Sequence, residues 1–212
     1  YVAPGDGVID IGAHAGDTSV LFAAAVGPSG KVFAVEPNSY VLPVLEENAR
    51  LNPDIAQIEV MPYAAVEEDG PLTFDYSDSG FCNGGDLSDI AAVKHGHVYR
   101  LEVEGRNILR EIQRTDPEWL PEVRLIKSDT EGHDADVIRL FAPIIRKYRP
   151  YLVCEIYRHM SAEAREAFHA FLTDDLGYRV YRAGLWDNLE AEELTPEALV
   201  SLRHFDIFCR PA

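Results

Sequence analysis

The sequence has few cysteines and no long apolar segment, and each shortage argues against a class of protein. Its three cysteines, Cys82, Cys154 and Cys209, are far apart and form no Cys-x-x-Cys pair, which argues against a disulfide framework. We therefore expect reduced thiols and a cytoplasmic location. No apolar run reaches the roughly 18 residues that a membrane-spanning helix needs. No signal peptide precedes Tyr1, which leaves room for an N-terminal segment of a longer protein.

Basic residues are also scarce. The chain has 19 Lys and Arg against 36 Asp and Glu, which gives a formal net charge of -17. Because phosphate recognition needs clustered Lys and Arg, this balance argues against a nucleic-acid partner, and repulsion argues against an anionic membrane. A length of 212 residues suits one domain over 1–212 with a sizeable core. The oligomeric state stays open.

Apolar strand-like segments alternate with helix-like segments, which predicts a mainly parallel sheet covered by helices on both faces. The predicted strands are 8–11, 31–35, 58–61, 123–128, 151–156, 178–181 and 205–209. The predicted helices are 17–26, 37–51, 109–115, 135–147 and 162–172. A glycine-rich stretch and an added strand at 98–103 interrupt this order. We therefore expect an extra hairpin or loop insertion over about 76–105, before the strand 123–128, with a substrate-covering loop at 77–85.

The turn after the first predicted strand is Gly12-Ala13-His14-Ala15-Gly16, and the next strand ends at Glu36. Glycines let a backbone approach a nucleoside closely, and an acidic residue about 20 positions on accepts hydrogen bonds from ribose hydroxyls. His14 stands where a dinucleotide-binding loop has its middle glycine, and its side chain would crowd a pyrophosphate. The loop therefore favours S-adenosylmethionine over a nicotinamide dinucleotide.

In this interpretation, loop N–H groups meet the cofactor's carboxylate, Asp10 lies near its ammonium group and Glu36 takes its ribose. Pro37 and the segment 63–65 flank the adenine. The expected cofactor-binding residues are Asp10, Gly12, Ala13, His14, Gly16, Thr18, Glu36, Pro37, Ala64 and Asp129.

A second group of polar residues follows the strands 123–128 and 151–156. Asp129, Glu131 and His133 come directly after the first of these, at the carboxyl edge where open α/β sheets bind ligands. Glu155 lies inside the second, otherwise apolar strand, where a carboxylate is costly unless it is paired or functional. An ion pair of Glu155 with Lys127 or Arg158 is the structural alternative.

These motifs resemble the FkbM-type S-adenosylmethionine-dependent methyltransferases over nearly the whole chain. The resemblance rests on the run 9–18, the triplet 36–38, the Lys-x-Asp-x-Glu-Gly signature at 127–132 and the closing segment 204–208. It implies a Rossmann-like class I methyltransferase fold, doubly wound, with seven strands in the order 3-2-1-4-5-7-6 and the seventh antiparallel. It also implies O-methylation of a hydroxyl on a sugar, glycolipid or polyketide-type natural product.

Methyl transfer to a hydroxyl requires a placed acceptor oxygen and a base or a metal to manage its proton. The expected catalytic residues are Asp129, His133 and Glu155, with Asp129 or His133 as general base. The alternative is a divalent cation on Asp129, Glu131 and Glu155, and we favour base chemistry without a metal. Glu131 and His133 would share one face of an extended segment, although Glu131 is explained equally well as a carboxylate at a helix N-terminus.

The expected partner is thus a small molecule or glycan that carries a hydroxyl. Two other functions stay open at this point. One is a nicotinamide-dependent oxidoreductase on a related sheet, and the other is a non-catalytic module that kept the nucleoside pocket.

Overall fold

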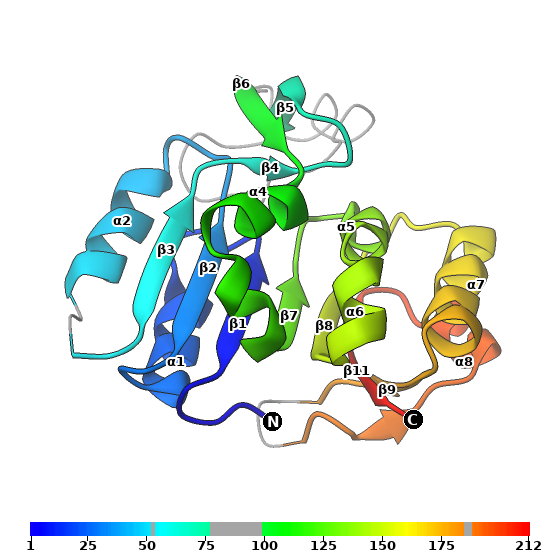
Figure 1. The fold of residues 1–212 in the computed structure, drawn as a ribbon. Coiled ribbons are helices and arrows are strands. Elements are labelled where there is room, and N and C mark those ends of the chain that lie inside the picture. Colours follow the sequence, from blue (N-terminus) through cyan, green and yellow to red (C-terminus); the bar gives the residue numbers. More distant parts are fainter. Residues whose placement is uncertain (52–53, 77–98, 185–187) are drawn as a thin grey trace.

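The computed structural model describes residues 1–51, 54–76, 99–184 and 188–212. Within them an eight-stranded sheet carries helices on its faces, and a three-stranded sheet lies beyond the tips of the central strands (Figure 1). The predicted loop 77–85 lies outside the described residues. No helix in the described part of the chain is long and apolar enough to cross a membrane.

The strands and helices have the following bounds. The large sheet consists of β1 (Gly7–Ile11), β2 (Lys31–Val35), β3 (Gln57–Met61), β7 (Val123–Ser128), β8 (Tyr151–Ile156), β9 (Tyr178–Arg182), β10 (Glu192–Glu193) and β11 (Phe205–Pro211). The small sheet consists of β4 (Ala64–Ala65), β5 (Gly70–Tyr76) and β6 (Tyr99–Arg106). The helices are α1 (Asp17–Val26), α2 (Leu42–Leu51), α4 (Ile108–Thr115), α5 (Asp134–Leu140), α6 (Ala142–Tyr148), α7 (Ala162–Ala170) and α8 (Pro196–Ser201). A 3-10 turn spans Pro117–Glu122 and a π-helical turn spans Phe171–Asp175.

The strand order of the large sheet is β10-β9-β11-β8-β7-β1-β2-β3. In this order the seven predicted strands follow one another as expected, and β11 is antiparallel to both β8 and β9. The fold-class prediction is therefore confirmed. The difference is β10, a two-residue strand added at the edge beside β9.

Alternate residues of the central strands pack on opposite faces, as the pleat of a strand requires. Val8, Val32 and Leu125 form one apolar cluster with residues of α1. Ile9 and Phe33 face the other way, into the larger cluster that includes α4, α5, α6 and α7. Because both faces are covered, the ligand site is left to the edge where the strands end.

Two predicted helices have different bounds in the structure. The helix predicted over 37–51 begins only at Leu42, so Pro37 lies in the segment before it. The helix predicted over 135–147 is two helices that meet at Phe141, which is fully buried. Pro143 lies in the first turn of α6, where its missing N–H is tolerated, whereas a continuous helix would lose a hydrogen bond there.

The small sheet extends outside the insertion predicted over about 76–105: β6 lies largely within that range, whereas β4 and nearly all of β5 precede it. β5 and β6 pair in antiparallel fashion along their length, and β4 pairs with the end of β6. β6 matches the added strand expected at 98–103, but β5 was not predicted. The alternation of Leu72 and Phe74 with polar neighbours is the pattern that would have indicated it.

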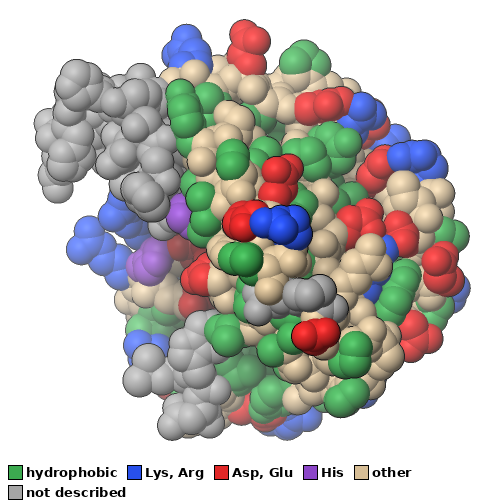
Figure 2. All heavy atoms as spheres, turned by 90° about the vertical axis from the view of Figure 1, so that its left-hand side faces the viewer, with side chains coloured by type: hydrophobic (Ala, Val, Ile, Leu, Met, Phe, Trp, Pro, Cys, Tyr) green, Lys and Arg blue, Asp and Glu red, His purple; other side chains and the backbone are tan. Residues whose placement is uncertain are grey.

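Acidic side chains are spread over the surface together with apolar and scattered basic ones, on the face that carries α2 (Figure 2). Leu21, Tyr40, Val44 and Leu51 are exposed large apolar residues. The cytoplasmic location stays a prediction, as does the expectation that neither nucleic acid nor a membrane is a partner.

The buried ammonium group of Lys31 links the amino end of β2 to two neighbouring segments, on the side of the sheet away from the carboxyl ends of the parallel strands. Lys31, the first residue of β2, lies 2.6 Å from the Glu59 carboxylate and donates a hydrogen bond to Asp116. This hydrogen bond lowers the pKa of Asp116. Burial alone would lower the pKa of Lys31, but the two carboxylates outweigh it and raise that pKa.

We predict that Asp116→Asn lowers the free energy of unfolding by about 1–2 kcal/mol at pH 7. Because the folded pKa of Asp116 lies below its unfolded value of about 3.9, the carboxylate stabilises the fold above that pH. The stabilisation is lost as the pH falls through the folded pKa, so the difference between variant and parent should shrink in acid. Urea unfolding at pH 7 and pH 2.5 measures both, and an unchanged difference would contradict the prediction. Asp136→Asn on the surface of α5 is the matched control.

Candidate functional site

A cavity of about 560 Å³ lies at the carboxyl ends of β1, β2 and β7. The small sheet contributes part of its wall through β4 and β5, which lie over these strand ends (Figure 1). Open α/β sheets bind ligands at this edge, and the volume is typical of a small-molecule site. The cavity is therefore the candidate functional site.

Gly12 brings the loop after β1 against the segment after β7. Its φ is +76°, and a Cβ at this position would lie 1.9 Å from the carbonyl oxygen of Asp129. The N–H of Asp129 donates to the carbonyl of Ile11 over 3.0 Å. Only glycine permits this approach, so the first loop glycine joins the two predicted motifs in one site.

The loop N–H groups are largely used within the protein. Those of Gly12 and Ala13 both donate to the carbonyl of Val35, at 2.9 and 3.1 Å. The N–H of His14 donates to Glu36 Oε2 over 2.9 Å, and that of Asn38 donates to Glu36 Oε1 over 2.8 Å. Burial raises the pKa of Glu36. These contacts hold the Glu36 carboxylate at the cavity wall, while each oxygen keeps a lone pair for a ligand.

Asp10 is fully buried and accepts three hydrogen bonds. The donors are Thr18 Oγ1 at 2.8 Å, Ser19 Oγ at 2.6 Å and Lys127 Nζ at 3.0 Å. Burial alone would lower the pKa of Lys127, but the negative charges of Asp10 and Asp129 raise it. The carboxylate thus ties the start of α1 to β1 and β7.

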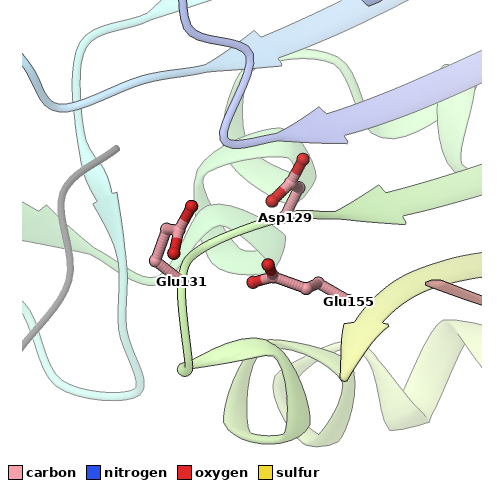
Figure 3. A group of neighbouring side chains, drawn as sticks. All are labelled: Asp129, Glu131 and Glu155. Atoms are coloured by element: carbon pink, nitrogen blue, oxygen red, sulfur yellow. The ribbon is translucent and has the colours of Figure 1, made fainter. Parts of the chain in front are cut away.

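Three carboxylates converge at the other end of the site. Oxygen atoms of Asp129, Glu131 and Glu155 lie within 4.8 Å of one another, and their side chains point toward a common centre (Figure 3). The expected extended segment is a turn instead, with positive φ values of 55° at Glu131 and 120° at Gly132. This turn, rather than alternation along a strand, brings Glu131 beside Asp129.

Glu155 is the most buried of the three, with 4% of its side chain exposed. The alternative of an ion pair with Lys127 or Arg158 is not found among the described residues: Lys127 pairs with Asp10, and the ionisable neighbour of Glu155 is His204, at 3.3 Å. Burial and the charges of Glu131 and Asp129 raise the pKa of Glu155 to about 8.

Asp134, rather than Glu131, is the carboxylate in the first turn of α5, and its hydrogen bonds come from the segment before the helix. Its carboxylate accepts hydrogen bonds from Ser128 Oγ at 2.6 Å and from the N–H groups of Thr130 and Gly132 at 3.2 and 3.4 Å. Burial raises the pKa of Asp134. His133 precedes α5, is exposed, and its ring lies edge-on to that of Phe74 at 6.2 Å between centroids.

The predicted site residues fall into two groups. Those that line the cavity are Gly12, His14, Thr18, Glu36, Pro37, Ala64, Asp129, Glu131 and His133. Those that are not among its described lining residues are Asp10, Ala13, Gly16 and Glu155. Leu72, Thr73 and Phe74 of the unpredicted β5 also line it, as does Lys127.

Comparison with known proteins identifies the domain. A family model described as the methyltransferase FkbM domain matches residues 10–180. No curated protein matches the chain significantly.

Three solved structures are similar to the chain. Methyltransferase FkbM from Methylobacillus flagellatus has 16% identity and a TM-score of 0.57, over 98% of this chain and 44% of that one. A fibrillarin/Nop5p complex has 13% identity and a TM-score of 0.51, over 98% of this chain and 73% of that one. A SAM-dependent O-methyltransferase from Thermotoga maritima has 14% identity and a TM-score of 0.50, over 99% of this chain and 60% of that one.

Identities this low show a shared fold and no more. The chain also spans less than half of the Methylobacillus protein. The family match is stronger, because it takes in both the glycine loop and the Asp129 motif and covers most of the sequence. On that match, the chain belongs to the FkbM methyltransferase family.

Proposed function

We propose that the chain is an S-adenosylmethionine-dependent methyltransferase that methylates a hydroxyl oxygen of a small molecule or glycan. The acceptors we expect are sugars, glycolipids and polyketide-type natural products. The observation that carries the proposal is that one cavity is lined by Glu36 and the glycine loop and also by Asp129 and Glu131. A region suited to a nucleoside and an acidic region thereby share one cavity.

The residues present fit the cofactor. Glu36 offers two carboxylate oxygens to ribose hydroxyls, and Pro37 and Ala64 offer apolar surface to an adenine ring. Among the described residues, the buried Nε2 of His14 has no hydrogen-bond partner, although His14 lines the cavity. Such a buried atom destabilises the protein unless a ligand forms a hydrogen bond with it, and the carboxylate or ammonium group of the cofactor's amino-acid end can do so.

Several loop N–H groups expected to meet that end are engaged elsewhere, as described above. The ring of His14 and the ammonium of Lys127, which also lines the cavity, are therefore the better candidates. Lys127 has three N–H donors and gives hydrogen bonds to Asp10 and to the carbonyl of Gly12. A third donor is left for a carboxylate.

The bound cofactor supplies an electrophilic methyl group whose bond to sulfur breaks, with the electron pair staying on sulfur, as the new bond to oxygen forms. The protein places the acceptor oxygen and manages its proton. Asp129 suits this task because it lines the cavity and its side chain is half exposed. It can accept the hydroxyl's hydrogen bond and then its proton.

The two other functions receive less support. A nicotinamide dinucleotide would need clearance at the loop position that His14 occupies, and the family match is to a methyltransferase. A non-catalytic module would bind S-adenosylhomocysteine without turning over any acceptor. Calorimetric titration with S-adenosylhomocysteine and with NAD distinguishes the methyltransferase from the oxidoreductase. Turnover of an acceptor distinguishes the methyltransferase from the non-catalytic module.

Glu36→Gln should weaken S-adenosylhomocysteine binding by about tenfold to a hundredfold, because a hydrogen bond to a charged group contributes about 1.5–3 kcal/mol. Isothermal calorimetry measures this affinity. Glu46→Gln, the same change at an exposed position of α2, is the matched control and should bind as the parent does. Equal affinity in the Glu36 variant would remove the ribose contact from the proposal.

Asp129→Asn should lower methyl transfer by about a hundredfold or more, the usual contribution of a positioned base, while cofactor affinity stays near that of the parent. Transfer of a labelled methyl group to a panel of sugars, glycolipids and polyketide alcohols gives the rate. A product stable to mild base distinguishes a methyl ether from a methyl ester. Asp136→Asn is the control, and undiminished turnover in the Asp129 variant would exclude the assigned role.

A further inference from the structure

The three carboxylates beside the cavity are spaced for a single ion. Two ligands of one cation are separated by at most twice the metal–oxygen distance, about 4 Å for Mg²⁺ and about 5 Å for Ca²⁺. The oxygens of Asp129, Glu131 and Glu155 all lie within 4.8 Å of one another. In Figure 3 they come from the end of β7, the following turn and β8, and all three point inward.

Glu155 indicates that this corner is built for a ligand. It is 95% buried, and within the described chain its Oε2 has no hydrogen-bond partner. A buried carboxylate oxygen without a partner is costly, because no hydrogen bond replaces the water that it lost. The side chain points at Asp129 and Glu131, whose ionised carboxylates cannot donate a hydrogen bond to it (Figure 3). A cation at their centre removes this penalty.

The buried hydroxyl of Thr130 is a second polar group of this corner. Within the described chain its Oγ1 has no hydrogen-bond partner. Thr130 follows Asp129 and precedes Glu131 in the sequence, and like them it lines the cavity. Polar groups left in this way are normally satisfied by water or a bound ion. A hydrated cation would supply such water.

Two groups of the described chain that can carry a positive charge lie beside the cluster. Lys127 Nζ lies 3.9 Å from Asp129, but it is 3.0 Å from Asp10 and so compensates that buried charge first. His204, which is half exposed, faces the other oxygen of Glu155 at 3.3 Å. Asp206 adds a further carboxylate on β11, directly opposite Glu155 in the sheet register.

We propose that Asp129, Glu131 and Glu155 bind one divalent cation of the Mg²⁺ or Mn²⁺ type. Carboxylate oxygens are the ligands such hard cations prefer, and three of them leave coordination positions for water or substrate. Since Asp129 and Glu131 line the cavity, these positions face the acceptor side of the site. The cation holds and orients the oxygen of the acceptor, while the second oxygen of Asp129 is left to accept the acceptor's proton. This role rests on the proposed function, whereas the binding of the cation does not.

Titration with Mn²⁺, followed by loss of the free-ion electron paramagnetic resonance signal, tests the site without any substrate. We expect one bound Mn²⁺ per chain, competition by Mg²⁺, and affinity at least tenfold weaker in Glu155→Gln. Glu166→Gln, the same change on the exposed surface of α7, should bind as the parent does. Glu131→Gln gives a second variant at a less buried ligand and should also weaken binding.

Absence of Mn²⁺ binding in the folded parent, or unchanged binding in both ligand variants, would overturn the inference. S-adenosylhomocysteine affinity measured on the same samples in EDTA keeps the two proposals apart. Cofactor binding without Mn²⁺ binding defeats the metal site alone, and Mn²⁺ binding without cofactor binding defeats the proposed function alone.

Discussion

The ion pair between Asp10 and Lys127 is the interaction on which the site depends. It joins the penultimate residues of two adjacent central strands, and the same carboxylate accepts hydrogen bonds from Thr18 and Ser19 at the start of α1. Removing either partner would leave a buried charge uncompensated, at a cost of about 3–5 kcal/mol. The pair thereby fixes the glycine loop and the end of β7 relative to each other, although Asp10 itself is not among the described lining residues.

The position of the cavity follows from this arrangement. With the strand ends held, the loop passes so close to β7 that only glycine fits at position 12. One side of the resulting space carries Glu36, fixed by two backbone donors, and the other carries the carboxylates after β7. The small sheet adds apolar surface from β4 and β5. A fold shared with other methyltransferases thus becomes a particular site through its loops and its insertion.

Most of the sheet was predictable because its strands are short apolar runs bounded by turn residues, and parallel strands joined by helices leave few possible orders. α1 and β7 have the predicted bounds. The predictions were wrong where tertiary contacts outweighed a local sequence preference. Pro37 suits a first helical turn, yet Glu36 accepts the N–H of Asn38 and holds this segment at the cavity, so α2 begins later. The carboxylate expected at the start of α5 is Asp134, not Glu131.

The sequence by itself determined the fold class, the two motifs and their shared edge of the sheet, because strand periodicity and glycine placement are local properties of the chain. Only the tertiary structure decided the partners. Lys127 belongs to Asp10 rather than to Glu155, and a left-handed turn at Glu131 brings Asp129, Glu131 and Glu155 together. These contacts join residues from different strands, and their distances depend on backbone register and burial, which no local pattern of residues specifies.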